Sequence, residues 1–176
     1  MGKLVEQGLY SILKNFSMYD LEHELALLEK TLPNAFRGRE ISDLGCGDGK
    51  TTLRLARILR PKKLVGYEVN KRLLELSKKR GLKTQKIDFE KKVPKGDLAI
   101  LWGVIHHLKK PEIFLRKIRK NFKGLVIREP VSKLRVFEAG KRLGKNQVLR
   151  ILKASGIGGR IIESERTKAL IVFSGE

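Results

Sequence analysis

The sequence DLGCGDGKTT, which runs from Asp43 to Thr52, follows a short apolar segment that begins at Arg39. Leucines at helical spacing come after it, between Leu53 and Leu59. A strand, a glycine-rich turn and a helix in direct succession are typical of α/β domains that hold a nucleotide-like ligand at the turn. The spacing within this turn therefore limits the ligands that the chain can bind.

Two phosphate-binding motifs are excluded by the positions of the glycines. A P-loop reads G-x-x-x-x-G-K-[ST] and needs a glycine at position 44, where Leu44 stands. A dinucleotide fingerprint reads G-x-G-x-x-G, but here the third glycine comes one residue early, at Gly49. The carboxylates of Asp43 and Asp48 would also repel phosphates. We therefore expect neither a P-loop nor a dinucleotide site.

Strand-like and helix-like segments alternate along the chain without a linker or an internal repeat. This alternation predicts parallel strands with helices on both faces of one sheet. The expected parallel strands span residues 39–44, 63–67, 83–87, 98–102 and 124–128. Only a few polar residues separate two further strands, 160–165 and 169–174, so these must pair antiparallel. The predicted fold class is α/β, with a doubly wound mixed sheet of five parallel strands plus a C-terminal antiparallel hairpin.

Asp43, Gly45, Gly47 and Gly49 form the pattern [DE]-x-G-x-G-x-G directly after a strand. This pattern resembles the first motif of the class I S-adenosylmethionine-dependent methyltransferases, whose sheet is Rossmann-like and seven-stranded. The likeness is to their small, type-11-like domain, and the terminal antiparallel hairpin is a hallmark of the same family. The resemblance implies one methyltransferase domain over residues 20–176, with residues 1–19 as an N-terminal lid segment.

The resemblance implies S-adenosyl-L-methionine as the cofactor and S-adenosylhomocysteine as the product. Glu68 ends the second strand, where the family places an acid for the ribose hydroxyls. Asp88 and Phe89 end the third strand, where the family contacts the adenine. The expected cofactor-binding residues are Asp43, Gly45, Cys46, Gly47, Gly49, Glu68, Val69, Asp88, Phe89, Leu101, Trp102 and Gly103.

The charge pattern supports a cationic ligand without reference to the family. Lys and Arg total 39 against 19 Asp and Glu, which gives a formal net charge of +20. Yet three successive predicted strands end in Asp43, Glu68 and Asp88, at the edge where open α/β sheets bind ligands. A pyrophosphate would be repelled there, whereas a sulfonium and an ammonium would be attracted. The alternative is that each acid caps the helix that follows it.

The acceptor is expected near the end of the fourth strand, where the sequence reads GVIHHL. This segment resembles small methyltransferases that act on metabolites and, more narrowly, tRNA wobble-uridine methyltransferases that esterify a carboxymethyl group. His106 and His107 are the candidate catalytic residues, because imidazole accepts protons near neutral pH. Alternatively, one histidine packs under the loop and the other is solvated, since methyl transfer draws mostly on proximity and orientation.

The excess of basic residues favours a polyanionic partner, and RNA, either tRNA or rRNA, is the leading acceptor. A small anionic metabolite and a noncatalytic role as an RNA-binding or activating subunit are the alternatives. A thermophilic, heat-adapted surface would also explain part of the charge. The candidate acceptor-binding residues come from the N-terminal segment and from the basic loop between Glu129 and Lys145: Tyr10, Tyr19, Lys133, Arg135, Lys141 and Arg142.

The single cysteine, Cys46, limits other chemistries. One cysteine cannot form an internal disulfide or a cysteine-rich zinc site, and we expect no metal. Within the glycine turn it most simply fills a small slot, which excludes a covalent cysteine mechanism of pyrimidine methylation. No apolar run reaches the length of a membrane span, and no signal peptide is visible, so the sequence predicts a cytoplasmic protein.

Overall fold

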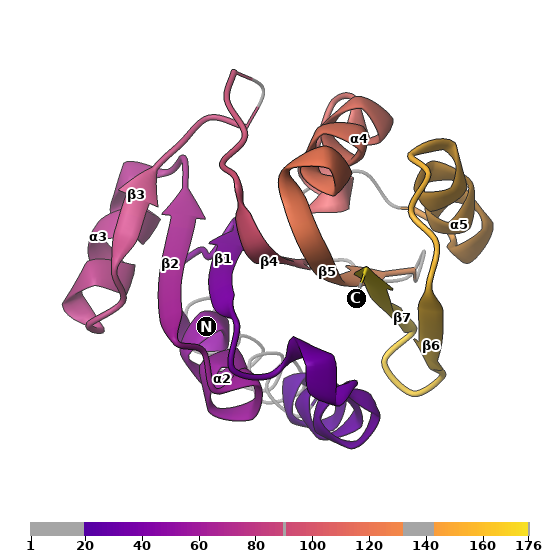
Figure 1. Ribbon diagram of the computed structural model, residues 1–176, viewed down its shortest axis with the longest axis horizontal. Helices are drawn as coiled ribbons and strands as arrows, with labels where there is room; N and C mark the ends of the chain where they lie inside the picture. The colour runs from indigo at the N-terminus through magenta and orange to yellow at the C-terminus, as the bar shows by residue number, and fades with distance from the viewer. Residues whose placement is uncertain (1–19, 90, 132–142, 176) are drawn as a thin grey trace, which may run out of the picture.

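The computed structural model describes residues 20–89, 91–131 and 143–175 (Figure 1). A seven-stranded sheet in the order β3-β2-β1-β4-β5-β7-β6 forms its centre. The strands are β1 (Glu40–Leu44), β2 (Lys63–Glu68), β3 (Thr84–Lys86), β4 (Gly96–Trp102), β5 (Phe122–Pro130), β6 (Arg160–Ser164) and β7 (Ala169–Gly175). Strands β1 to β5 pair in parallel, and β7 runs antiparallel to both β5 and β6. The predicted mixed α/β sheet is confirmed.

Helices connect the parallel strands and cover both faces of the sheet (Figure 1). An N-terminal helix includes residues 20–31, and the others are α2 (Lys50–Leu59), α3 (Lys71–Lys79), α4 (Pro111–Asn121) and α5 (Lys145–Ala154). Two short 3₁₀ helices are η1 (Asn34–Phe36) and η2 (Ile105–His107). The Asn70 side chain caps α3 by accepting backbone hydrogen bonds, and Pro111 begins α4. None of the described helices has the length and apolar composition needed to cross a membrane.

The alternating side chains of β4 divide the core into two clusters. Ala99 and Leu101 lie on the face that α4 and α5 cover. Leu98 and Ile100 lie on the other face, which the N-terminal helix and α2 cover. All four side chains are at most 1% exposed. A parallel strand with helices on both sides is expected to be apolar throughout, as this one is.

The last two strands enter the sheet in reverse order, so that β7 lies between β5 and β6. Every residue from Ala169 to Phe173 of β7 is buried, whereas four of the five residues of β6 are exposed or half-buried. The more apolar strand therefore occupies the interior position, and the more polar strand forms the edge.

β5 is longer than the sequence predicted because it is paired on both sides, to β4 and to β7. The predicted strand ended at Arg128 and left Glu129 in a basic loop that ran to Lys145. Instead, Glu129 pairs with Leu170 of β7 and is 1% exposed. Lys145 is the first residue of α5. The carboxylate of Glu129 therefore lies at the buried carboxyl end of a central strand and not in the expected loop.

Candidate active site

Three acidic side chains lie at the carboxyl ends of neighbouring strands. Because β1, β2 and β3 are adjacent and parallel, Asp43, Glu68 and Asp88 share one edge of the sheet. Asp43 and Glu68 are buried, and Asp88 is half-buried. The glycine turn joins this edge directly, since the backbone N–H of Gly47 donates to Glu68 Oε2 at 3.0 Å. The edge therefore combines buried carboxylates with exposed turn backbone.

Two glycines of the turn are required for different physical reasons. Gly45 has a φ of +89°, and a Cβ there would lie 2.8 Å from Val104 Cγ2, so the turn packs tightly against the segment after β4. Gly47 has a φ of +56°, and a Cβ there would meet no described atom within 4 Å. The space next to Gly47 is therefore open, and a ligand can approach the backbone closely there.

Asp43 is an acid whose ionisation is disfavoured by its surroundings. The pKa of Asp43 is raised to about 6, mainly by burial; the hydrogen bond from Thr52 opposes the rise, and the nearby charge of Glu68 contributes to it. Thr52 Oγ1 donates to Asp43 Oδ2 at 2.5 Å. The other oxygen, Oδ1, is buried and has no hydrogen-bond partner among the described residues. A buried carboxylate oxygen without a partner is costly unless a ligand group satisfies it.

Glu68 is held by backbone groups on both sides of the site. Its Oε1 accepts from the N–H groups of Val69 and Asn70, both at 2.9 Å, while its Oε2 accepts from Gly47. The carboxylate thus satisfies backbone donors just before α3, as the capping alternative requires, and it also lies against the open turn. The neighbouring Val69 is 52% exposed. An apolar side chain exposed at this edge offers a surface for a flat ring.

Cys46 fills a small space beneath the turn. Its Sγ lies 2.7 Å from where a Cβ on Gly66 would be, so the glycine of β2 makes room for the thiol. Burial, together with the charges of Asp43 and Glu68, raises the pKa of Cys46 to about 12. The thiolate is therefore not available near neutral pH, and the side chain cannot act as a nucleophile.

The end of β4 presents backbone rather than side chains to this edge. Leu101 is fully buried in the core, and Trp102 lies on the opposite face, with the guanidinium of Arg128 6.0 Å from its ring centroid. Gly103 has a φ of +70°, and its N–H donates to the carbonyl of Arg128 at 2.7 Å. A Cβ on Gly103 would lie 3.5 Å from Arg128 Nη1, in ordinary van der Waals contact.

His106 forms a buried pair with Glu129, a residue that the sequence analysis missed. The ring Nδ1 of His106 contacts Glu129 Oε1, and Glu129 also accepts from the backbone N–H groups of Ile105 and His106. His106 is 7% exposed, and its Cε1 lies 3.7 Å from where a Cβ on Gly103 would be. His107 is exposed, and its ring centroid lies 4.0 Å from that of His106. The two histidines therefore occupy different environments.

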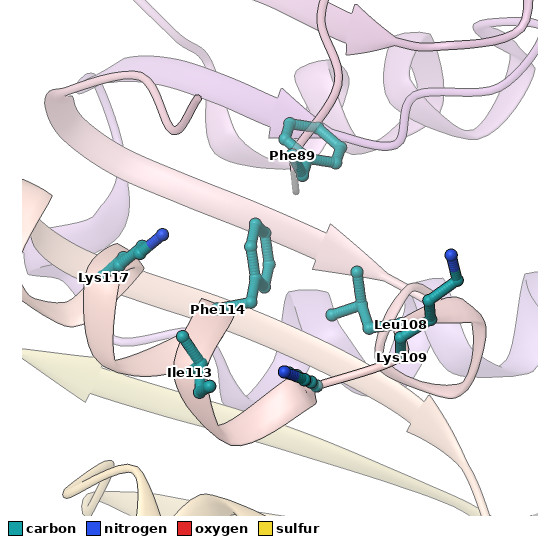
Figure 2. A pocket seen from close by; sticks show the side chains of 7 residues that line it. Phe89, Leu108, Lys109, Ile113, Phe114 and Lys117 are labelled. Atoms are coloured by element: carbon teal, nitrogen blue, oxygen red, sulfur yellow. The ribbon is translucent and has the colours of Figure 1, made fainter. Parts of the chain in front are cut away.

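The loop after β3 carries the third acid and an aromatic ring. Lys91 Nζ lies 3.8 Å from Asp88 Oδ2. The half-buried Phe89 packs against Phe114 of α4, with ring centroids 5.4 Å apart. Figure 2 shows Phe89 facing Phe114 and Leu108 across a pocket. The predicted adenine end of the site therefore borders a cavity between the β3–β4 loop and α4.

Six predicted acceptor-binding residues lie outside the described residues: Tyr10, Tyr19, Lys133, Arg135, Lys141 and Arg142. Among the described residues, Glu129 and Thr52 were not predicted from the sequence as parts of the site. Glu129 directly follows the predicted strand 124–128, as the other acids follow theirs, and it could have been found in the same way. It was assigned to the loop because the length of β5 was underestimated. Thr52 has no comparable signal, since its role depends on how the first turn of α2 faces Asp43.

Residues 42–123 match the protein family described as a methyltransferase domain. No curated protein sequence matches the chain. Its structure is similar to an S-adenosylmethionine-dependent methyltransferase from Mesorhizobium loti, at 16% identity and a TM-score of 0.68, over 86% of this chain and 96% of that chain.

Two longer proteins are similar over about half of their own length. The pyocyanin biosynthetic protein PhzM has 18% identity and a TM-score of 0.66, over 85% of this chain and 53% of that chain. The mitomycin 7-O-methyltransferase MmcR has 18% identity and a TM-score of 0.67, over 86% of this chain and 52% of that chain.

The matched segment contains the glycine turn, the acidic strand ends and the histidine pair, and the seven-stranded sheet ends in the antiparallel order β5-β7-β6. Residues 42–123 therefore form part of a class I S-adenosylmethionine-dependent methyltransferase domain. S-adenosylmethionine is accordingly its methyl donor.

Proposed function

We propose that the chain methylates RNA, and that His106 receives the proton that the acceptor loses. One observation carries the choice of acceptor: the exposed Lys109 and Lys110 lie two and three residues after His107 in the chain. Positive charge at the border of the site, on a chain of net charge +20, favours an acceptor that carries phosphates.

The residues at the carboxyl edge fit S-adenosylmethionine in charge and in shape. The unpartnered Asp43 Oδ1 suits a cationic amino group, and the open space over Gly47 admits a ligand close to Glu68. The exposed Val69 offers an apolar face to the adenine. The residues that we propose to hold the cofactor are Asp43, Gly45, Cys46, Gly47, Gly49, Glu68, Val69, Asp88, Phe89, Leu101, Trp102 and Gly103, with Leu101 acting through its backbone alone.

When bound, S-adenosylmethionine supplies an electrophilic methyl group on a sulfonium. The residues of the chain act on the acceptor, whose proton must be removed. Because a carboxylate accepts only, the Nδ1–H of His106 donates to Glu129, which leaves the lone pair of Nε2 to take a proton. The backbone N–H groups of Ile105 and His106 donate to Glu129 and fix the position of its carboxylate. Glu129 is therefore a positioning residue, and His106 is the candidate base.

A small anionic acceptor is the second candidate. The cavity beside Phe89 has a volume of roughly 270 Å³, close to the lower end of the range for small-molecule sites. Two of the structurally similar proteins are named for small-molecule products or substrates, pyocyanin and mitomycin. This pocket is apolar and has basic side chains around it. It therefore favours an anionic acceptor, whether that acceptor is RNA or a small molecule.

Transfer of a labelled methyl group separates the two acceptors. The chain is incubated with methyl-labelled S-adenosylmethionine and with total cellular RNA, the same RNA after nuclease digestion to nucleosides, or the low-molecular-weight fraction. We expect label in intact RNA only. Label confined to the low-molecular-weight fraction would establish the small-molecule acceptor and refute the RNA proposal.

The roles of His106 and Glu129 are tested by a pH profile. His106→Gln is expected to lower kcat by about 10²–10⁴-fold and to remove the rise of activity with pH near neutrality. Glu129→Gln should lower kcat less and change the pH dependence while the KM for the cofactor stays the same. His107→Gln is the matched control on the neighbouring, exposed histidine. Equal effects of the His106 and His107 substitutions would contradict the assignment.

A further inference from the structure

The cavity beside the predicted adenine end has a defined chemical character. Its lining consists of Phe89, Leu108, Lys109, Lys110, Ile113, Phe114 and Lys117. The apolar members come from the β3–β4 loop, the segment after η2 and the first turns of α4, as Figure 2 shows. Phe89 and Phe114 make a tilted aromatic wall, with 55° between the ring planes. All charged lining residues are lysines.

The lysines surround the apolar wall on several sides. In Figure 2, Lys109 and Lys117 stand on opposite sides of Phe114. Lys109, Lys110 and Lys117 are all exposed. Neither Lys110 nor Lys117 forms an ion pair with any residue that the structure describes. Their charges are therefore available to an anion, while the wall between them is available to a ring.

The pocket also exposes apolar surface that folding alone does not explain. Ile113 is 46% exposed although it lies in the second position after the helix-opening Pro111. An exposed isoleucine beside half-buried Phe89 and Leu108 leaves a patch that favours stacking or apolar contact. With a volume of roughly 270 Å³, the cavity is below the usual lower limit of about 300 Å³ for drug-sized ligands. One nucleotide is a better match than a longer segment.

We propose that this pocket binds one nucleotide of the RNA next to the nucleotide that is methylated. Its base packs on Phe114 and Ile113, and its phosphates lie against Lys110 and Lys117. The chain leads from His106 to Lys110 in four residues, so the pocket adjoins the reactive end of the site. Apolar contact with a base is tolerant of sequence, whereas phosphate contacts fix the register of the strand. The inference rests on the proposed RNA acceptor and names one of its binding subsites.

Binding of a labelled single-stranded oligoadenylate RNA, followed by fluorescence anisotropy over a range of salt, tests the charged part. The double variant Lys110→Ala/Lys117→Ala should bind about tenfold more weakly and should flatten the slope of log affinity against log salt by about 1.4. The matched control is Lys62→Ala/Lys63→Ala, which removes two exposed lysines at the amino end of β2, the opposite edge of the sheet. The control should change affinity by less than about threefold, because salt at about 0.1 M limits the attraction between exposed charges to about 10 Å.

The apolar part is tested with Ile113→Ser and with an abasic oligonucleotide of equal charge. The parent chain should bind the abasic strand at least about fivefold more weakly than oligoadenylate, in keeping with base stacking on apolar side chains. Ile113→Ser should reduce that preference without changing the salt slope. Equal binding of the two strands by the parent chain would overturn the proposal.

Further outcomes separate this proposal from the proposed function. If the parent methylates RNA but the pocket and control pairs behave alike, the pocket assignment is wrong and the RNA acceptor stands. If the parent neither binds nor methylates RNA, both are wrong. If the pocket variants weaken S-adenosylhomocysteine binding and leave RNA binding intact, the pocket belongs to the cofactor site and the proposal is overturned.

Discussion

Asp43 shows how one buried carboxylate links stability to ligand binding. Its pKa is raised to about 6, mainly by burial, and its Oδ1 lacks a partner among the described residues. The charged form is therefore unfavourable in the fold without a ligand. A group placed to attract a cation destabilises the protein that holds it, which is a common feature of binding sites.

Replacement of Asp43 by Asn should stabilise the chain above pH 6. A raised carboxyl pKa contributes stability below the unfolded value of 3.8, and that contribution is lost as the pH rises through about 6. At pH 8 the substitution should therefore raise the free energy of unfolding by about 1–3 kcal/mol, while at pH 4 most of the gain should be absent. Urea denaturation at both pH values measures this. A gain of the same size at both would contradict the burial of the charge.

Glu68 serves both the fold and the cofactor site, so its two roles need two variants. Glu68→Gln keeps one oxygen acceptor, for Val69 and Asn70, but turns its NH2 group toward the N–H of Gly47. It should weaken S-adenosylhomocysteine binding by about ten- to a hundredfold, because charge-assisted hydrogen bonds are lost. Glu68→Ala should also lower the free energy of unfolding by about 1–3 kcal/mol, since three backbone N–H groups lose their acceptor. Calorimetric titration and urea denaturation separate the two effects. Unchanged affinity in Glu68→Gln would leave Glu68 with the structural role alone.

At the scale of elements, the N-terminal helix is tied to the centre of the sheet by a buried ion pair. Arg128 Nη2 donates to Glu24 Oε1 at 2.6 Å, and both side chains are at most 7% exposed. The two residues are 104 positions apart in the chain. The pair lies beside Trp102, so the docking of this helix also determines the environment at the end of β4.

Removing one partner of this pair should cost more than removing both. Glu24→Ala leaves a buried guanidinium without its counter-charge and should lower the free energy of unfolding by about 3–5 kcal/mol. The double variant Glu24→Leu/Arg128→Met should recover most of that loss, because apolar side chains of similar volume fill the same space and leave no buried charge unpaired. The comparison requires thermal or urea unfolding of all three chains. A double variant as unstable as Glu24→Ala would show that the helix docks through the charges themselves.

The elements themselves were largely predictable, because the repeat of apolar residues depends only on local geometry. The predicted strands 39–44 and 63–67 agree with β1 and β2 to within one residue at each end. The end of β5 was not predictable in this way, because Arg128 and Glu129 are polar and interrupt the apolar run. They remain in the strand because both neighbours pair with it and buried partners satisfy their charges.

At the scale of the whole molecule, the net charge of +20 acts on stability as well as on binding. Like charges spread over the surface repel one another in the folded chain, and salt screens that repulsion. The midpoint of thermal unfolding should therefore rise as the ionic strength increases from about 0.01 M to 0.15 M, over which the Debye length falls from about 30 Å to about 8 Å. Differential scanning calorimetry with a neutral osmolyte as control checks this. A midpoint that falls with salt would indicate that attractive ion pairs outweigh the repulsion.

The sequence by itself determined the α/β class, the glycine turn and the series of acids at the strand ends. Each of these properties can be recognised within a short stretch of sequence, because it depends on local periodicity or on the conformational freedom of glycine. Only the tertiary structure decided that β7 lies inside the sheet, that Glu129 meets His106 and that Glu24 meets Arg128. Such pairings depend on which buried surfaces the whole chain can satisfy together, and no local pattern encodes contacts between distant positions.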